Sequence, residues 1–432
     1  MDPVLIGAIV LFALLLLLAL GVPVSTAIGG LGLVGMVLMI PQAFVTKTGI
    51  SGFMTLESYN LAVLPLFSLM AMIIMHTGVG AALYDVFYKT VGRFSGGLAV
   101  STILTCAVFA AICSTTTACA LTVGLIALPE MRKAGYKDSL IAGSIASGGT
   151  LGPFIPPSSP MIVYGIATGT SITRLFVAGV VPGVMCMVLY SLTVLILCKK
   201  SPEYGPKGPK FSTKDIMLAL AKCGEVIVLI IIVLGGMFAG FFTPTEAAGI
   251  GAAGAIIITL IRRKLNWKNF IESIKGAMKT CGMVYAMLIA AGFMNTLMTL
   301  SRLPVTVANA IASANVPIIV VLILIVVVNL ILGFFMDGLG IMMLTIPIFF
   351  PIVHALGVDP IWFGVIQVVS VQIGNITPPV GMALFIVKGI DKSLSMKDIY
   401  MGGYTFCPAA FLAMAAILAF PIISTFLPSL LR

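Results

Sequence analysis

Oxygen-bearing side chains are rare in the apolar parts of this chain, and two short segments concentrate them. Residues 113–117 read Cys-Ser-Thr-Thr-Thr, and residues 336–340 read Met-Asp-Gly-Leu-Gly. Hydroxyl, carboxylate and backbone carbonyl oxygens are the ligands that hard cations such as sodium prefer. Hydroxyls also donate hydrogen bonds to anions. These segments are therefore our first candidates for binding a cation and an anionic substrate.

A second pattern, G-x-x-x-P-P, occurs at residues 152–157 and again 222 positions later, at 374–379. Two adjacent prolines remove two backbone N–H donors and force the residue before them out of the helical region, so carbonyl oxygens upstream lose their partners. Inside a bilayer, unwound backbone is tolerated only where it is buried in protein or lines a cavity. Each pattern therefore predicts a membrane helix that is interrupted at a binding site. The plainer alternative is a packing kink.

The composition indicates an integral membrane protein. Of 432 residues, 60% are hydrophobic and 9% are charged, and the mean hydropathy is +1.19. Apolar runs at 4–20, 226–242 and 316–335 are long enough to cross roughly 30 Å of hydrocarbon as helices. The formal net charge of +10 does not indicate a nucleic-acid partner, because the basic residues lie in short loops between apolar segments, where they set topology.

The sequence matches itself at an offset of 222 residues, which indicates an internal duplication. Pro129 aligns with Pro351, and the two Pro-Pro pairs align with each other. We predict a first repeat at 1–200, a linker at 201–222 and a second repeat at 223–432. The elements expected in the first repeat are scaffold helices at about 1–76, a hairpin at about 97–130, a broken helix at about 139–165 and a final helix at about 175–198. Those expected in the second are scaffold helices at about 223–297, a hairpin at about 317–352, a broken helix at about 360–387 and a final helix at about 404–427.

Basic residues indicate how each repeat threads the membrane, because short cytoplasmic loops retain Lys and Arg. If 98–128 is a re-entrant hairpin, five cytoplasmic segments hold 20 of the 24 Lys and Arg residues: 77–97, 129–138, 199–222, 262–279 and 388–399. Lys47, Arg174, Arg302 and Arg432 then lie outside. Each repeat makes an odd number of crossings, five, so the second repeat is inverted. Both termini are expected on the periplasmic side.

The expected fold is thus an all-α polytopic membrane protein with two inverted-topology repeats, each containing a re-entrant hairpin and a broken helix. Segments 113–117 and 336–340 become the tips of two hairpins that open to opposite faces. Each tip is expected to face the Pro-Pro break of its own repeat, and we predict a sodium site at each. This architecture is typical of secondary transporters that work by alternating access, and the two opposed hairpins favour an elevator-type mechanism.

Some residues keep more than one interpretation. Asp337 suits substrate binding, sodium attraction or protonation, because an intramembrane carboxylate is usually functional. The hydroxyls of 114–117 have a plainer alternative, a hydrogen bond to the preceding helical turn. Glu246 follows Pro244 near an expected helix start, so it fits an N-terminal cap as well as a transport role.

The motifs do not indicate an enzyme or an ATP-driven pump. The sequence contains no G-x-x-x-x-G-K-[ST], H-E-x-x-H or G-x-S-x-G pattern. Its eight cysteines are scattered, without disulfide or zinc-site spacing. Ion coupling remains as the energy source, so the residues predict a secondary transporter.

Four longer motifs give a resemblance to a known family: GGTLGPFIPPSSPMIVYG, GFFMDGLGIMMLTIPIFFP, IGNITPPVGMALF and FFTPTEAAGIGA. With them, almost the whole chain resembles the large permease subunit of tripartite ATP-independent periplasmic (TRAP) transporters in the separate-subunit form, with an ion-transporter-superfamily-like fold. The resemblance implies sodium-coupled uptake of an organic acid anion, such as sialic acid or a C4-dicarboxylate, that a periplasmic substrate-binding protein delivers. It also implies a small four-helix membrane subunit as a separate chain, two or more sodium ions, and a place among the lipids of the bacterial inner membrane.

The resemblance further implies roles for single residues. The expected sodium ligands, some through backbone carbonyls, are Cys113, Ser114, Thr115, Gly152, Phe154 and Pro157 in the first region and Gly338, Gly340, Gly374, Thr377 and Pro379 in the second. The expected substrate contacts are Thr115, Thr116, Ser158 and Asp337. Many family members read SGSS where this chain reads CSTT. Because a thiol is a poor ligand for a hard cation, either the Cys113 carbonyl serves or Ser114 or Thr116 substitutes.

Two other functions remain as alternatives. One is a stand-alone ion-coupled dicarboxylate carrier of the same broad fold. The other is a non-transporting scaffold subunit of a membrane complex, which only the basic loops suggest.

Overall fold

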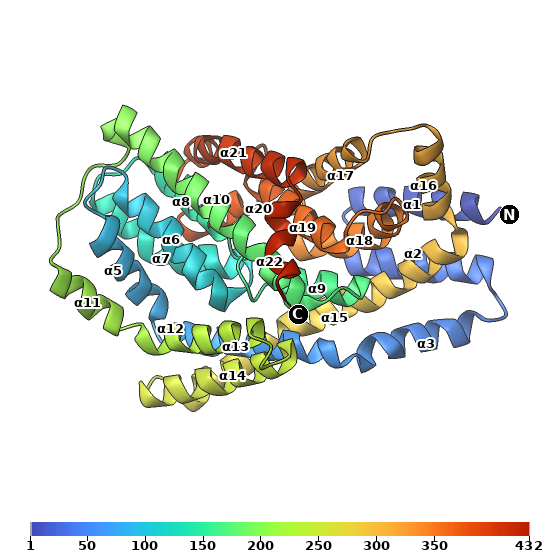
Figure 1. Cartoon of the computed structure of the whole chain (residues 1–432), viewed down its shortest axis with the longest axis horizontal. Coiled ribbons are helices and arrows are strands. Elements are labelled where there is room, and N and C mark those ends of the chain that lie inside the picture. Colours follow the sequence, from blue (N-terminus) through green and yellow to red (C-terminus); the bar gives the residue numbers. More distant parts are fainter. Residues whose placement is uncertain (1, 432) are drawn as a thin grey trace.

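The computed structural model describes residues 2–431, and every regular element within that range is a helix. The expected all-α class is therefore confirmed, and Figure 1 shows the helices packed into one elongated body. The first part of the chain forms α1 (Pro3–Ala19), α2 (Val24–Met39), α3 (Phe44–Glu57), α4 (Val63–Met75), α5 (Val79–Val91), α6 (Gly97–Cys113), α7 (Thr116–Lys133), α8 (Asp138–Gly149), α9 (Ser159–Thr168) and α10 (Ile172–Lys200). The rest forms α11 (Thr213–Ala221), α12 (Gly224–Ile230), α13 (Gly236–Phe238), α14 (Pro244–Ile261), α15 (Trp267–Ser301), α16 (Leu303–Ser313), α17 (Ile318–Gly333), α18 (Gly338–Ala355), α19 (Pro360–Ile376), α20 (Met382–Ile390), α21 (Met396–Ala419) and α22 (Ile422–Ser429).

Two pairs of consecutive helices occupy the segments that were expected to form hairpins. Helices α6 and α7 are joined by only two residues, Ser114 and Thr115, and α17 and α18 are joined by residues 334–337. In Figure 1 the pair α6 and α7 lies left of centre, while α17 and α18 lie right of centre. Helices α7 and α18 start 222 residues apart and each contains an internal proline at the aligned position.

The two Pro-Pro segments interrupt helices, but to different extents. After α8 the chain is non-helical from Thr150 to Ser158, whereas α19 continues through Ile376 and only residues 377–381 separate it from α20. Both Pro-Pro peptide bonds are cis. The same sequence pattern therefore gives a long unwound segment in the first half and a short one in the second.

Helices from the two halves of the chain interleave. Helix α2 packs on α15, and α4 packs on α14 and α15, which forms one group. Glycines allow the close approach of α2 and α15: a methyl group at Gly32 would lie 2.9 Å from the backbone nitrogen of Met294. A second group forms where α8 packs on α6, α7 and α21, and α19 packs on α17 and α21. Helix α18 of the second group contacts α2, α15 and α16 of the first.

Three local features stand out: the start of α14, the bend between α3 and α4, and a helix within the linker. Helix α14 starts with a capping box, in which the Glu246 carboxylate accepts from the Thr243 backbone N–H at 2.8 Å, so capping accounts for this glutamate. Helices α3 and α4 form a bent pair with an angle of 50° near Ser58, while the aligned α15 is continuous over 35 residues. The linker 201–222 is not wholly irregular, because α11 occupies its second half and its preceding Phe211 ring contacts Tyr88.

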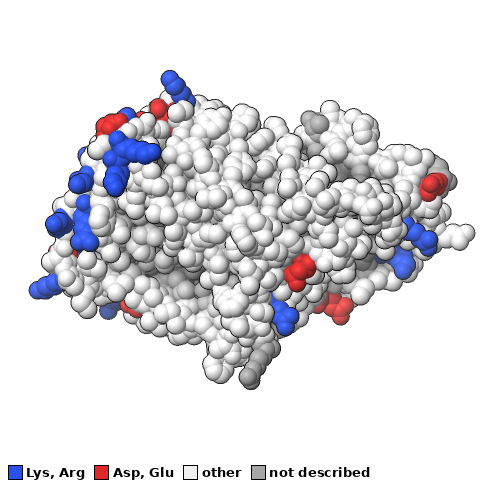
Figure 2. Space-filling model, turned by 45° about the horizontal axis from the view of Figure 1, so that its top comes forward, with Lys and Arg blue, Asp and Glu red and all other residues white. Residues whose placement is uncertain are grey.

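The helices suit a membrane, and the charges gather at one end. In residues 2–431, five helices are long and apolar enough to cross a bilayer, and the number rises to seven if each of two bent pairs forms one span. On the face that Figure 2 shows, most of the visible Lys and Arg side chains lie at the left end of the molecule, together with some Asp and Glu, and most of the remaining surface is uncharged. This distribution agrees with the basic segments of the sequence. Arg432, expected outside, lies beyond the described residues.

Candidate functional site

The first hairpin tip is a tight, buried turn with an unpartnered hydroxyl. Ser114 ends α6 in the left-handed conformation, with φ of +58°, and Thr115 caps α7 by accepting from the Ala118 N–H. Cys113 and Ser114 are buried, and Thr115 and Thr116 are half-buried. Within residues 2–431, the buried Ser114 Oγ has no hydrogen-bond partner. A buried hydroxyl in this state is free to bond to a water molecule or an ion.

The first break packs directly against this tip. A methyl group at Gly152 would lie 2.9 Å from the carbonyl oxygen of Thr115, so only glycine fits there. The hairpin tip and the Pro-Pro break of the first half are therefore neighbours, as the sequence predicts. The buried Phe154 and Pro157 belong to the same unwound segment.

Each break leaves one carbonyl oxygen without a hydrogen-bond partner, because proline has no backbone N–H to donate. Pro156 and Pro379 lack the N–H that would bond to the carbonyls of Gly152 and Asn375. In the described part of the chain, neither of these carbonyl oxygens accepts a hydrogen bond. The other two carbonyls affected are satisfied: Ser158 Oγ donates to Pro153 O at 2.5 Å, and Thr377 N–H donates to Gly374 O at 3.2 Å.

Ser158 thus belongs to the break itself. Its side chain is fully buried, donates to Pro153 O and accepts from the Met161 N–H as the N-cap of α9. The Ser158 hydroxyl therefore stabilises the unwound segment and the start of α9, and its expected contact with substrate stays a prediction.

The second tip carries an exposed carboxylate. Asp337 is the N-cap of α18 and accepts from the Leu339 N–H at 3.2 Å. Gly340 lies beneath it, since a methyl group there would be 3.0 Å from the Asp337 carboxylate. Behind the tip, the backbone of Gly333 touches that of Gly374, where an added methyl group would come within 2.9 Å of the Gly333 Cα. The second tip region therefore also packs on its own break.

A buried glutamine connects the two tips, and the sequence alone did not single it out. Thr116 Oγ1 donates to Gln372 Oε1 at 2.7 Å, and Asn375 Nδ2 donates to the same oxygen at 3.2 Å. Gln372 also lines the second tip, because a methyl group at Gly338 would lie 2.9 Å from its Nε2. The Asn375 side chain is 2% exposed, and its Oδ1 has no partner in residues 2–431.

A second cluster of amide side chains lies closer to the N-terminus of α19. Asn329 Nδ2 of α17 donates to Gln367 Oε1 at 2.6 Å and to Ser370 Oγ at 2.9 Å, and all three side chains are fully buried. The positions 222 residues earlier hold Ala107, Ile145 and Gly148. This amide cluster therefore has no counterpart at the aligned positions of the first half. In the sequence, this cluster could have been recognised from the Asn and Gln residues that lie close together in one otherwise apolar segment.

The donor set at the tips fits sodium. The first region offers the Ser114 hydroxyl and the Gly152 carbonyl, and the second offers the Asn375 side-chain and main-chain oxygens, all without a partner among the described residues. These are neutral oxygen donors, which suit a hard monovalent cation better than a transition metal. No cluster of three or more His, Cys, Asp or Glu side chains that would hold another metal occurs in residues 2–431.

The sequence matches one protein family over nearly its full length. The DctM component of the tripartite ATP-independent periplasmic transporter matches residues 11–423. A C4-dicarboxylate TRAP transporter large permease protein DctM from Pseudomonas aeruginosa is 33% identical over 82% of this chain and 83% of its own length. The sialic acid large permease SiaM from Vibrio cholerae is 28% identical over 87% of both chains. These relatives are transporter permeases and not enzymes.

One relative is longer, and one solved structure shares the fold. The isethionate TRAP transporter permease DctMQ from Oleidesulfovibrio alaskensis is 34% identical over 90% of this chain, and the chain spans only 60% of that protein's length. The crystal structure of the YdaH transporter from Alcanivorax borkumensis superimposes with a TM-score of 0.62 at 14% identity, over 97% of this chain and 98% of that one. At this low sequence identity, the similarity to the YdaH structure concerns the fold alone.

Proposed function

Because this chain belongs to the DctM family of tripartite ATP-independent periplasmic transporters, as a large permease subunit, we propose that it carries an organic acid anion into the cell together with sodium. Its relatives are named for C4-dicarboxylates, sialic acid and isethionate. All are small organic acids with at least one anionic group. The proposed substrate class is therefore an organic acid anion of this size.

The observation that carries the sodium proposal is the contact between the first tip and the first break. There the unpartnered Ser114 hydroxyl and the unpartnered Gly152 carbonyl belong to segments in direct contact. We assign the first sodium site to these groups and to the carbonyls of Cys113, Thr115, Phe154 and Pro157. The second site would use Asn375, Thr377 and Pro379 with the tip residues Gly338 and Gly340, and Gly374 supports it by close packing.

Substrate recognition is proposed at the surface between the tips. Thr115 and Thr116 are half-buried and Asp337 is exposed, so these side chains are accessible to an anion or to its hydroxyl groups. Asp337 would bind hydroxyl or amine groups of the substrate, since a carboxylate repels another carboxylate. A bound sodium ion would supply positive charge near the substrate anion, and this attraction is the proposed basis of coupling.

Alternating access is proposed to involve movement of one helix group against the other. The hairpins and broken helices belong to one packed group, and α18 supplies much of its contact with the scaffold helices α2, α15 and α16. We propose an elevator movement of the hairpin group along this contact, with the basic end facing the cytoplasm.

The proposed partners follow the family. We infer that the chain works with a periplasmic substrate-binding protein and with a small four-helix permease that is a separate chain. Reconstitution in liposomes with an inward sodium gradient tests this: accumulation of the acid is expected only with all three proteins present. Accumulation without any binding protein would instead indicate a stand-alone carrier, and assembly without transport of any candidate acid would indicate a scaffold subunit.

A substitution at Gly152 tests the sodium site. In Gly152→Ala the new methyl group would come within 2.9 Å of the Thr115 carbonyl and displace the first tip. We expect the sodium concentration for half-maximal uptake to rise at least tenfold. The matched control is Gly389→Ala, because a methyl group there meets nothing within 4 Å. An unchanged sodium dependence in a folded Gly152→Ala protein would refute the assignment.

A further inference from the structure

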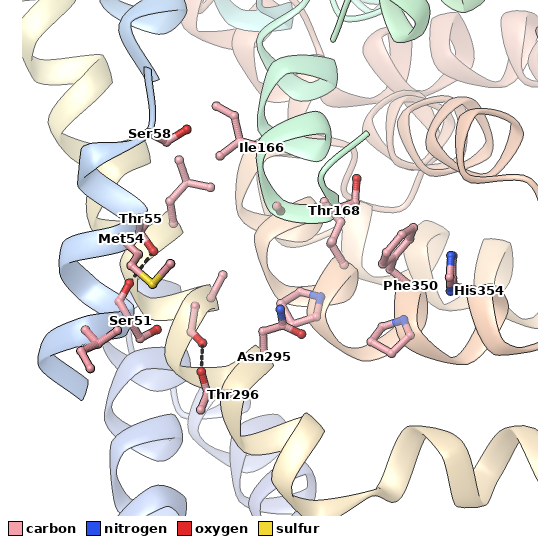
Figure 3. Close-up of a pocket in the computed structure, with 18 of the residues that line it drawn as sticks. Ser51, Met54, Thr55, Ser58, Ile166, Thr168, Asn295, Thr296, Phe350 and His354 are labelled. Atoms are coloured by element: carbon pink, nitrogen blue, oxygen red, sulfur yellow. Dashed lines mark hydrogen bonds between the residues drawn. The ribbon is translucent and has the colours of Figure 1, made fainter. Parts of the chain in front are cut away.

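A cavity of about 890 Å³ lies outside the tip region, between the two helix groups. Figure 3 shows α3 on one side of it, with Ser51, Met54 and Thr55, while Phe350 and His354 of α18 stand on the other. Helix α15 contributes Asn295 and Thr296, and α9 contributes Ile166 and Thr168. The cavity therefore has walls from both helix groups.

This cavity is separate from the proposed sodium and substrate site. Its first lining residue on α18 is Ile346, eight residues beyond Gly338. Eight residues of helix correspond to roughly 12 Å. None of the residues assigned to the tips or breaks lines the cavity.

The polar groups of the cavity divide into engaged and free ones. Thr55, Thr168 and Thr296 donate their hydroxyl protons to carbonyls of their own helices. Five other lining residues make no side-chain hydrogen bond to any residue of 2–431: Lys47, Ser51, Ser58, Asn295 and His354. Each of these five carries an N–H or O–H donor.

The charge of the lining is positive. Lys47 is one of the few basic residues distant in sequence from the basic segments, and no Asp or Glu lines the cavity. Apolar side chains, including Met54, Ile166 and Phe350, cover the remaining wall. A cation, several donors and apolar walls suit a small anion with a carbon skeleton and hydroxyl groups.

We propose that this cavity is a second binding site for organic acid anions, an outer vestibule in which Lys47 attracts the anionic group and Ser51, Ser58, Asn295 and His354 donate hydrogen bonds. The proposal rests on the proposed function for its substrate class. Because α3 and α15 form one wall and α18 and α9 the other, movement of the hairpin group would change this site. The anion would occupy the vestibule before it reaches the hairpin tips.

Thiol labelling tests the charge of the vestibule without any transport. The described cysteines, which include all eight of the chain, are buried, so Asn295→Cys would supply an exposed thiol in the cavity. In the complex with the small permease, we expect a sulfonate-bearing methanethiosulfonate to react faster than a trimethylammonium-bearing one, after correction for their rates with a free thiol. Lys47→Gln should reduce this preference by roughly tenfold, because one charge at several ångströms in water changes each rate about threefold and acts in opposite directions on the two reagents. Lys47→Arg should retain it.

Protection by substrate tests binding itself. Millimolar succinate, sialic acid or isethionate should slow the labelling of Asn295→Cys, and less so with Lys47→Gln. No protection by any of the three acids, or an equal reagent preference in Lys47→Gln and Lys47→Arg, would overturn the proposal. Sodium-driven uptake is measured on the same preparation. Uptake without protection refutes the vestibule alone, and protection without uptake refutes the proposed function alone.

Discussion

Gln372 is the residue that joins the two hairpin tips. Its Oε1 accepts from Thr116 of the first tip and from Asn375 beside the second break, and its Nε2 lies against Gly338 of the second tip. A side chain in this place can transmit a change at one tip to the other, since both tips share one buried hydrogen-bond network. It also holds the Thr116 side chain in a fixed position at the first tip.

Replacement of Gln372 should therefore impair both stability and transport. Gln372→Leu leaves the donors of Thr116 and Asn375 without their acceptor, which costs about 1–3 kcal/mol for a buried group. We expect a lower thermal unfolding temperature and at least a tenfold lower rate of sodium-driven uptake. Thr117→Ala is the control, because that side chain is exposed and makes no hydrogen bond in residues 2–431. Uptake that survives in Gln372→Leu would show that the tips work independently.

At the scale of elements, the ends of the hairpin and of the second broken helix are tied together by an ion pair. Arg132 near the end of α7 bonds to Asp391 after α20, with 2.6 Å between Nη1 and Oδ2. The Ser393 hydroxyl and N–H, together with Arg132, lower the pKa of the Asp391 carboxyl to about 2. The pair therefore connects the end of α7 to the loop after α20 at the basic end of the molecule.

The ion pair predicts an acid-dependent loss of stability. The pKa of Asp391 falls on folding, so its contribution is present above the ordinary carboxyl pKa near 4 and is lost as the pH drops towards 2. The Arg132 side chain is 41% exposed, so solvent screening limits the effect to less than about 1 kcal/mol. Thermal unfolding at pH 7 and pH 3 should show a smaller acid shift for Asp391→Asn than for the wild type. Glu130→Gln, at an exposed pair on α7, should behave like the wild type; an identical shift in both variants would contradict this account.

How far the sequence predicts these elements depends on the range of the interactions involved. The orphaned carbonyls of Gly152 and Asn375 follow from the prolines four residues later, so local chemistry predicts them. The contact between Thr116 and Gln372 joins residues 256 positions apart, and no local pattern indicates it. Nor does the repeated motif reveal that α19 stays helical through Ile376 while the first break unwinds from Thr150. The hydrogen bond from the Ser158 hydroxyl to the Pro153 carbonyl is likewise visible only in the folded break.

At the scale of the whole molecule, the basic residues define an orientation. Most of the Lys and Arg side chains visible in Figure 2 lie at one end, which we propose faces the cytoplasm. A cysteine at Lys207, an exposed linker position, should therefore resist an impermeant thiol reagent applied to intact cells and react after the membrane is opened. Labelling of Lys207→Cys from outside would reverse the orientation. The buried native cysteines keep the background low.

Sodium coupling is the central claim, because the paired tips and breaks were assigned to sodium from their unpartnered oxygens. The most direct test is the accumulation of the organic acid in liposomes that contain the permease pair and the binding protein, with sodium varied on each side. With a tenfold inward sodium gradient we predict accumulation well above the outside concentration. With equal sodium on both sides we predict equilibration only. Equal accumulation under both conditions would contradict the account.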